Sequence, residues 1–189
     1  DHALSGLTVS HAPGVYGWGF QIYGYLKAGL HGVVTGCVIR DNRARDFGAG
    51  ACFFSGMRGT FRNCIFRGNY APRDGAGLAN YGCEVRLEHC TFTENTATYT
   101  GKAIYNVGTG PIDVRSSILW DKGAGSGELG GDLATVTVTD SFVRGGYAGT
   151  GNRADDPALN LFGYQGQWSA SRGAAAVDQA PPTDIEGEP

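Results

Sequence analysis

The stretch that decides the fold runs from Cys37 to Val107 and contains the same sequence pattern three times. Each line begins with a cysteine, reaches an asparagine five residues later and is followed by a glycine-containing tetrapeptide: Cys37-Val-Ile-Arg-Asp-Asn42 with Gly48-Ala-Gly-Ala51, Cys64-Ile-Phe-Arg-Gly-Asn69 with Gly75-Ala-Gly-Leu78, and Cys90-Thr-Phe-Thr-Glu-Asn95 with Gly101-Lys-Ala-Ile104. The cysteines recur after 27 and then 26 residues, and the glycines keep the same spacing. A fixed period of this length indicates a repeat architecture.

The repeating unit is a β unit. Its β-branched and aromatic residues alternate with polar ones, which is the burial period of a strand, and its several glycines would each cost up to about 1 kcal/mol in a helix. One such unit cannot bury its apolar face alone and must stack on its neighbours. With two weaker repeats at Ser117 and Ser141, the sequence predicts an all-β, right-handed parallel β-helix of about five coils.

In such a solenoid, equivalent positions of successive repeats form rows along the axis. Two inward rows are expected to fill the core, namely Val34, Phe61, Leu87, Val114 and Val138, and Ile39, Phe66, Phe92, Leu119 and Val143. A corner is expected at Gly36, Asn63, His89, Ser116 and Asp140. At a second corner, Asn42, Asn69 and Asn95 are expected to stack as a ladder of hydrogen-bonded amides, in a position where asparagine tolerates left-handed backbone.

Three of the five cysteines, Cys37, Cys64 and Cys90, hold the same place in successive repeats. This favours an inward stack of small apolar side chains, the usual role of a buried free cysteine. Neighbours in a parallel stack lie about 4.8 Å apart, which also suits a disulfide. The sequence leaves open a bridge between two of them.

Composition narrows the class of protein. A chain of 189 residues is expected to form one domain. The 32 glycines follow no Gly-X-Y period, which excludes collagen. The net charge of −3 provides no basic field for nucleic acid, and no apolar run is long enough to span a bilayer. Because the sequence begins at Asp1, we expect either a processed chain or a piece of a longer one. We favour the piece of a longer chain.

The repeat pattern covers residues 1–151 and fades after Asn152. Residues 152–189 are richer in proline and alanine, and Asp156-Pro157 is a turn signal. We therefore expect 152–189 to be a non-coil segment that packs along the solenoid or caps it.

Two features resemble known families. The lines Phe66-Arg-Gly-Asn69 and Phe92-Thr-Glu-Asn95, each followed by a glycine tetrapeptide, resemble the FxxN and GGAI repeats of polymorphic outer-membrane-protein-type surface proteins. The segments Asp156-Pro-Ala-Leu159, Ala175-Ala-Val-Asp178 and Thr183-Asp-Ile-Glu-Gly-Glu-Pro189 resemble the ending of bacterial, pectin-lyase-like parallel β-helix proteins. The resemblance implies export and an extracellular or cell-surface setting. It leaves the chemistry open, since such folds host adhesins and carbohydrate-active enzymes alike.

A row of alternating charge, Arg62, Glu88 and Arg115, is the first candidate site. Ion pairs on a solvated surface contribute little, so the row is either ordinary surface or a site where the arginines bind a saccharide carboxylate.

A second row carries carboxylates at Asp41, Glu94 and Asp121. Glu94 and Asp121 fall in adjacent repeats, and two like charges so close favour a raised pKa or a hard cation such as Ca²⁺. With Lys122 and an arginine, either Arg62 or Arg115, the row resembles what a polysaccharide lyase needs. The alternative is that these are ordinary charged corner residues.

Aromatic residues form the third candidate site. Tyr16, Trp18, Tyr23 and Tyr25 crowd the first coil, and Trp120 lies beside the carboxylate row. Such rings suit a sugar or a protein partner, although they equally well plug one end of the core.

The fourth candidate is an outward apolar stripe on one sheet: Val38, Ile65, Thr91, Ile118 and Phe142. An apolar stripe of this kind is usually covered. We expect residues 152–189 to lie across it, and a second chain is the alternative.

The preferred function is a structural or adhesive extracellular module without a cofactor. Its partner is a cell surface, a polysaccharide or a second copy, and exposed coil ends would allow end-to-end filaments. The rival functions are a lyase acting on an acidic polysaccharide, with Ca²⁺ as its cation, and a non-catalytic carbohydrate-binding module.

Overall fold

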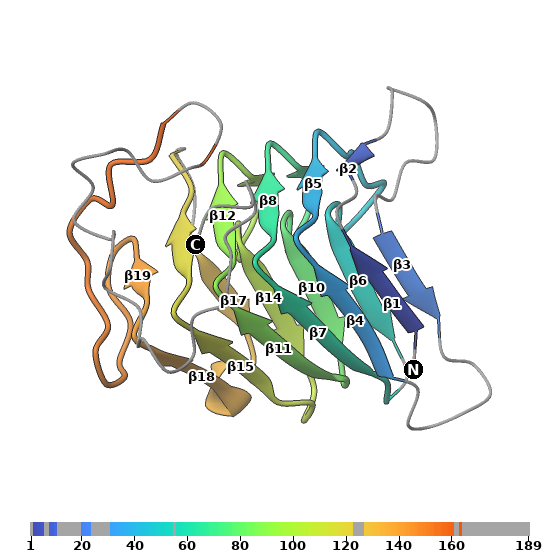
Figure 1. The fold of residues 1–189 in the computed structure, drawn as a ribbon. Helices are drawn as coiled ribbons and strands as arrows, with labels where there is room; N and C mark the ends of the chain where they lie inside the picture. The colour runs from blue at the N-terminus through green and yellow to red at the C-terminus, as the bar shows by residue number, and fades with distance from the viewer. Residues whose placement is uncertain are drawn as a thin grey trace.

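The chain is a parallel β-solenoid (Figure 1). A computed structural model describes residues 2–5, 8–10, 20–23, 31–54, 56–122, 127–160 and 163. Three sheets form the walls, and every strand pair in them is parallel.

Successive turns of the chain add strands to sheets A, B and C in that order, and in the described residues the last turn adds strands to sheets A and B alone. Sheet A contains, in spatial order, β1 (His2–Ser5), β4 (His31–Thr35), β7 (Arg58–Arg62), β11 (Glu84–Glu88), β15 (Ile112–Arg115) and β18 (Val136–Thr139). Sheet B contains β2 (Thr8–Ser10), β5 (Val38–Arg40), β8 (Ile65–Arg67), β12 (Thr91–Thr93), β16 (Ile118–Trp120) and β19 (Phe142–Val143). Sheet C contains β3 (Phe20–Tyr23), β6 (Ala51–Phe54), β10 (Leu78–Tyr81), β14 (Ile104–Val107) and β17 (Leu129–Gly131).

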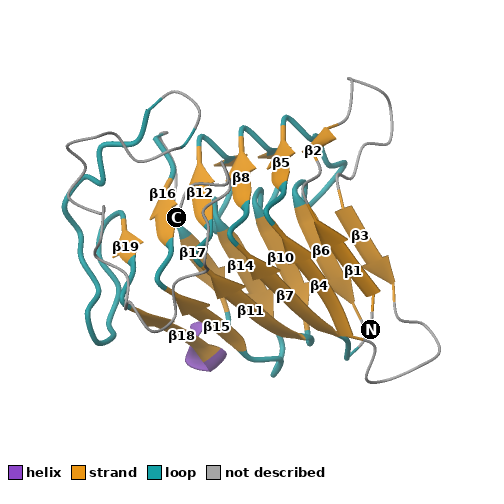
Figure 2. Ribbon diagram, in the orientation of Figure 1, coloured by secondary structure: helices purple, strands orange, loops and turns teal. Residues whose placement is uncertain are grey.

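Two short strands, β9 (Tyr70–Ala71) and β13 (Thr96–Ala97), pair between sheets B and C. The described residues contain no α-helix, only one 3₁₀ turn, η1 (Leu133–Thr135), which is purple in Figure 2. The predicted fold class is confirmed. The coil count differs slightly, since two sheets contain six strands and the third contains five.

Both predicted core rows are confirmed by the strand register. Val34 pairs with Phe61, and the row continues through Leu87, Val114 and Val138. Ile39 pairs with Phe66, and that row continues through Phe92, Leu119 and Val143. All ten side chains are buried.

The corners explain why the chain turns where it does. Between sheets A and B, each turn has one residue with a left-handed φ of 47 to 60°, and these are the five predicted: Gly36, Asn63, His89, Ser116 and Asp140. At the next corner the prediction was wrong by one residue. The left-handed positions are Asp41, Gly68 and Glu94, with φ of 56, 63 and 58°, and not the asparagines that follow them.

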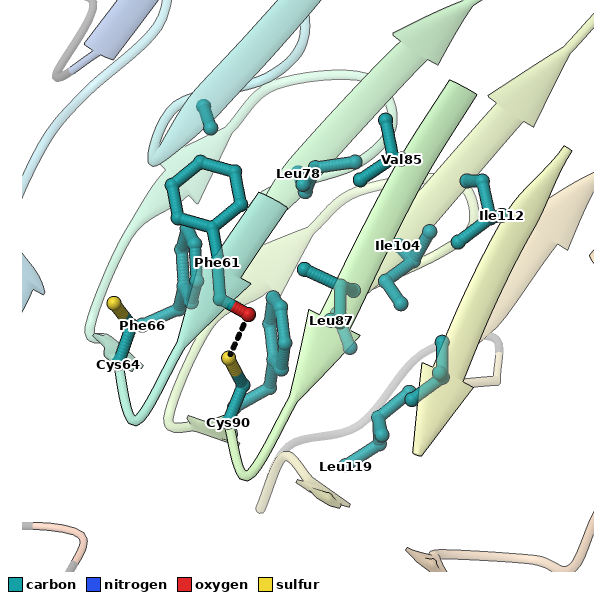
Figure 3. Packing of buried hydrophobic residues seen from close by; sticks show 14 of the residues in the cluster. Phe61, Cys64, Phe66, Leu78, Val85, Leu87, Cys90, Ile104, Ile112 and Leu119 are labelled. Atoms are coloured by element: carbon teal, nitrogen blue, oxygen red, sulfur yellow. Dashed lines mark hydrogen bonds between the residues drawn. The ribbon is translucent and has the colours of Figure 1, made fainter. Parts of the chain in front are cut away.

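Phenylalanines of neighbouring coils meet in the core, where Phe61 and Phe66 lie side by side (Figure 3). The rings of Phe66 and Phe92 stack with centroids 4.4 Å apart and planes 2° apart. The ring of Phe61 meets Phe66 edge-on at 5.1 Å. Such aromatic pairs stabilise a core beyond the area that they bury.

The glycine before Leu78 leaves room for this stack. A Cβ atom at Gly77 would lie 2.5 Å from the carbonyl oxygen of Ala103 and 2.6 Å from Cδ1 of Phe92. The repeated glycine at this position therefore allows sheet C and the aromatic stack to approach each other closely.

The first residues of the 152–189 segment, Asn152 and Arg153, cover one end of the solenoid. The backbone of Arg153 pairs along β19, donating to the carbonyl of Ser141 and accepting from the amide of Val143, both at 2.9 Å. The side chain of Asn152 donates to the carbonyl of Val138 in β18 at 2.9 Å. Strand edges of sheets A and B are thus capped at this end, which removes bare hydrogen-bonding groups.

We expect Phe66→Ala to destabilise the protein by about 3–5 kcal/mol, because it deletes a fully buried ring from the stack and leaves a cavity. Urea unfolding followed by circular dichroism measures this. The control Tyr99→Ala removes a ring that is 62% exposed and is expected to change stability by less than about 0.5 kcal/mol. Equal effects of the two substitutions would contradict the packing.

Candidate functional site

The corner between sheets B and C contains the predicted amide ladder. Asn42 donates from its backbone N and from Nδ2 to Oδ1 of Asn69, at 3.1 and 3.0 Å. Asn69 donates in the same way to Oδ1 of Asn95, at 3.0 and 2.9 Å. The Nδ2 of Asn69 and of Asn95 also donate to the carbonyls of Ile39 and Phe66. The side chains of Asn69 and Asn95 therefore each accept two hydrogen bonds from one coil and donate to the coils on both sides.

Asp121 is the next rung of this ladder, which corrects its predicted place in a carboxylate row with Glu94. Trp120 pairs in register with Thr93, but the left-handed corner residue that follows in other coils is missing here. Oδ1 of Asp121 consequently accepts from the backbone N and Nδ2 of Asn95, at 2.6 and 3.1 Å. Its side chain is fully buried, whereas Glu94 is exposed.

Asp121 belongs to a buried charged cluster. Its backbone N donates to Oε1 of Glu128 at 3.1 Å, and Nζ of Lys102 lies 3.9 Å from that Oε1. Nζ of Lys102 also donates to the carbonyl of Asp121 at 3.4 Å, as does a guanidinium nitrogen of Arg144. Asp121, Glu128 and Lys102 are 0%, 3% and 4% exposed, so these charges interact at low dielectric.

The sequence contains a signal for this cluster that sequence reasoning missed. Lys102 stands in the repeat position that is Ala49 and Ala76 in the two preceding coils, both of which are buried. A lysine in a buried alanine row requires acidic partners. Glu128 lay in a weak repeat and was not considered.

Burial shifts both acids of the cluster. It raises the pKa of Asp121 well above its ordinary range, and the neighbouring charge of Glu128 adds to this effect. Burial also raises the pKa of Glu128, although the charge of Lys102 opposes this. The cluster thus favours keeping a proton.

The groups predicted for a lyase do not converge. Glu94 pairs with Arg67 at 2.9 Å on the outer corner, Asp121 is buried in the ladder, and Lys122 is exposed. Arg62 and Arg115 lie on sheet A. The carboxylates of Glu94 and Asp121 are therefore not presented together for Ca²⁺, and no group of three or more potential metal-binding side chains occurs among the described residues.

The charged row on sheet A has the predicted register but not the predicted pairing throughout. Arg62 pairs with Glu88 of the next coil at 2.6 Å. Arg115 instead pairs with Asp113 of its own strand at 2.7 Å, and this hydrogen bond raises its pKa. These exposed pairs contribute little to stability.

The cysteine row lies inside the solenoid, and all five cysteines of the chain are buried and form no disulfide. Sγ of Cys90 donates to the carbonyl of Phe61 in the preceding coil at 3.5 Å (Figure 3). The row continues with serines, since the backbone N of Cys90 donates to Oγ of Ser117 and that of Ser117 donates to Oγ of Ser141, both at 3.0 Å. Oδ1 of Asn152 accepts from the backbone N of Ser141 and ends the row.

The predicted aromatic sites are only partly described. Tyr16, Trp18 and Tyr25 lie outside the described residues, and Tyr23 is described only as part of β3. Trp120 was expected to face a ligand, but it is 7% exposed. Its ring packs in a buried cluster with Leu159 and does not face outward toward a ligand.

Part of the outward stripe on sheet B is covered by residues that follow Asn152. Ile118 and Phe142 pack with Leu159 and are 4% and 3% exposed. At Gly163, a Cβ atom would lie 3.4 Å from Cγ2 of Ile65, so the chain passes over the middle of the stripe. Val38 and Thr91 remain half-buried.

An aromatic surface on sheet C was missed in the sequence. Phe53 points into the core and Phe54 outward, where its ring stacks on Tyr81 of the next coil with centroids 4.9 Å apart and planes 7° apart. Phe47 packs against Tyr81 at 5.1 Å. Tyr23 pairs with Phe54 in the strand register. We call Phe47, Phe54 and Tyr81, which are all half-buried, the aromatic row.

A second asparagine ladder, also missed, stabilises the corner between sheets C and A. Nδ2 of Asn80 donates to Oδ1 of Asn106 and to the carbonyl of Cys83, both at 2.8 Å. Nδ2 of Asn106 donates to Oγ1 of Thr135 at 2.9 Å. The spacing of 26 residues between the two asparagines was the available signal.

Comparison with known proteins gives one match. The model of the family described as "Right handed beta helix region" matches residues 6–145. Searches of curated proteins and of solved structures return no match. In the part of the chain that the structure describes, no helix has the length and apolarity needed to cross a membrane.

We expect Asn69→Ala to destabilise the protein by about 2–4 kcal/mol, because it leaves buried donors on Asn42 and the carbonyl of Ile39 without partners. Chemical denaturation measures the loss. The control Thr96→Ala changes an exposed residue at the same corner and should have little effect. A loss below about 0.5 kcal/mol for Asn69→Ala would show that the ladder is not stabilising.

Proposed function

Because the chain belongs to the right-handed β-helix family, we propose that it is a structural and adhesive module of an extracellular or cell-surface protein that contacts carbohydrate. The observation that carries the proposal is the aromatic row, held on the outer face of a solenoid whose corners are stapled by side-chain ladders. Export, a bacterial source and kinship with surface-repeat proteins remain implications of the sequence resemblance.

The ladders support a structural role. Asn69 and Asn95 bond to the adjacent coils through buried groups, so one coil cannot shift without breaking several buried hydrogen bonds. Buried networks that are fully satisfied rigidify a fold and specify a single arrangement. A rigid scaffold of this kind suits a spacer or a platform.

The aromatic row supports the adhesive role. Phe54 and Tyr81 are already stacked, so little side-chain freedom is lost when a ligand binds. Asp74 and Arg73 lie close enough to Tyr81 to act on its hydroxyl electrostatically. Apolar rings with a few polar groups beside them are what a saccharide site requires.

We propose that any association between copies uses the side faces of the solenoid. End-to-end stacking at the β18–β19 end would have to displace Asn152 and Arg153 from the strand edges that they cover. A filament through this end is therefore not part of the proposal.

Binding to a panel of soluble neutral and acidic polysaccharides, measured by affinity electrophoresis and calorimetry, tests the function. We expect at least one polymer to bind, and we expect Phe54→Ala and Tyr81→Ala each to weaken binding about tenfold, the loss of about 1.4 kcal/mol of aromatic contact.

The matched control is Tyr70→Ala, because Tyr70 is also half-buried but is stacked under Arg43 at a different corner, 4.5 Å from its ring centroid. It should bind like the unmodified protein. If no polymer in the panel binds, or if Tyr70→Ala weakens binding as much as Phe54→Ala, the proposal is wrong. Release of unsaturated sugar products from a uronate polymer would instead favour the lyase.

A further inference from the structure

The hydrogen bonds of the asparagine ladder follow one rule, and its last two members, Asp121 and Glu128, must also satisfy this rule. In each rung, the backbone N and side-chain Nδ2 donate together to one oxygen of the next rung: from Asn69 to Asn95, and from Asn95 to Asp121. Asp121 repeats the first half of this rule, since its backbone N donates to Oε1 of Glu128 at 3.1 Å. Glu128 thus takes the place of the next rung, although it comes from the far end of a connector and not from the next coil.

The second half of the rule needs a donor on the Asp121 side chain. In Asn69 and Asn95 that donor is Nδ2, whereas in Asp121 the corresponding atom is Oδ2. This Oδ2 and Oε2 of Glu128 are buried and have no hydrogen-bond partner among the described residues. As an ionised carboxylate, Asp121 would place an unpaired oxygen beside a second carboxylate at low dielectric, which is strongly unfavourable.

The nearby positive charges do not remove this conflict. Lys102 lies 3.9 Å from Oε1 of Glu128, so it compensates a charge on Glu128. Both Lys102 and Arg144 reach Asp121 through its backbone carbonyl and not through its carboxyl group. Lys122, the remaining charged neighbour in sequence, is exposed.

A metal ion fits the pair of carboxyl groups of Asp121 and Glu128 less well than a proton does. The described residues supply only two acidic side chains here, and the ammonium group of Lys102 beside Glu128 would repel a cation. Hard divalent cations take six or more oxygen ligands, whereas one proton satisfies both orphan requirements.

We propose that Asp121 and Glu128 share one proton, carried on Oδ2 of Asp121 and donated to the carboxylate of Glu128, and that this proton latches Glu128, which directly precedes β17, to the end of the ladder. Lys102 balances the single negative charge that remains. The latch is pH-sensitive, because removing the proton leaves two adjacent buried carboxylates and weakens the attachment of Glu128 and β17 to the ladder.

The sign of the pH dependence follows from the raised pKa of Asp121. The folded chain retains a proton that the unfolded chain loses near the ordinary carboxyl value of about 3.9. The contribution of this group to stability is therefore full below that value. It declines as the pH rises toward the folded pKa, and it is lost above it.

Carbon-13 NMR of the Asp121 carboxyl carbon, followed through a pH titration of the intact chain, tests the proton directly. We expect the signal to remain at its protonated position at pH values well above those at which an ordinary aspartate titrates. In Glu128→Gln the new amide supplies a donor to Asp121, and the titration should move to lower pH. A signal that titrates at the ordinary aspartate value in the unmodified protein would overturn the proposal, and so would an unchanged titration in Glu128→Gln.

Hydrogen exchange of the β17 amides, Leu129–Gly131, tests the latch. Over the pH range in which Asp121 loses its proton, we expect protection to fall at least about tenfold in the unmodified protein. Asp121→Asn supplies a permanent donor and should keep protection constant over that range. The control Asp113→Asn removes a half-buried carboxylate on sheet A and should behave like the unmodified protein. Equal loss of protection in Asp121→Asn would exclude a latch set by this proton.

Discussion

The structure depends on one constraint: in a parallel solenoid, every side chain lies about one strand spacing from the same position of the next coil. Apolar groups in such a row stack easily, as Phe66 and Phe92 do. Buried polar groups can share a row only if each accepts from one neighbour and donates to another. Asparagine meets this condition because its amide has both an acceptor and a donor, and Asn69 and Asn95 use both. The interior cysteine and serine row meets it with carbonyl and hydroxyl acceptors.

This constraint explains which features the sequence predicts. The core rows and the corner with Asn63 and His89 follow from period and residue type alone, since each is a local property repeated at a fixed spacing. The position of Asp121 could not be predicted in this way. A single corner residue is missing from its coil, so the alignment with Glu94 is correct up to Trp120 and wrong one residue later.

Features that depend on non-local contacts were also out of reach. Trp120 is buried by Leu159, which lies beyond the repeats. The aromatic row combines Phe54 and Tyr81 from strands with Phe47 from a corner, and a corner residue gives no alternation signal. Asn80 and Asn106 did give a signal, a spacing of 26 residues, but it lay outside the three lines in which the repeat is strongest.

The same hydrogen-bonding rule connects the asparagine ladder to the acid pair at its end. The ladder is neutral as far as Asn95 and then passes to Asp121 and Glu128, where a proton has to supply the missing donor. Lys102 and Arg144 come from two other parts of the chain and converge on the same few atoms. The aromatic row lies on a different wall of the solenoid, on sheet C. The aromatic row and the buried acid pair can therefore be mutated independently of each other.

The direct measurement of the axial rows is a set of nuclear Overhauser contacts in the intact protein. Side-chain amide protons of Asn69 should show contacts to the backbone amide of Asn42 and to the side chain of Asn95, and the ring protons of Phe66 should show contacts to those of Phe92. If these contacts are absent, or if the asparagine amides exchange with solvent as fast as exposed ones, the coils do not stack in this register.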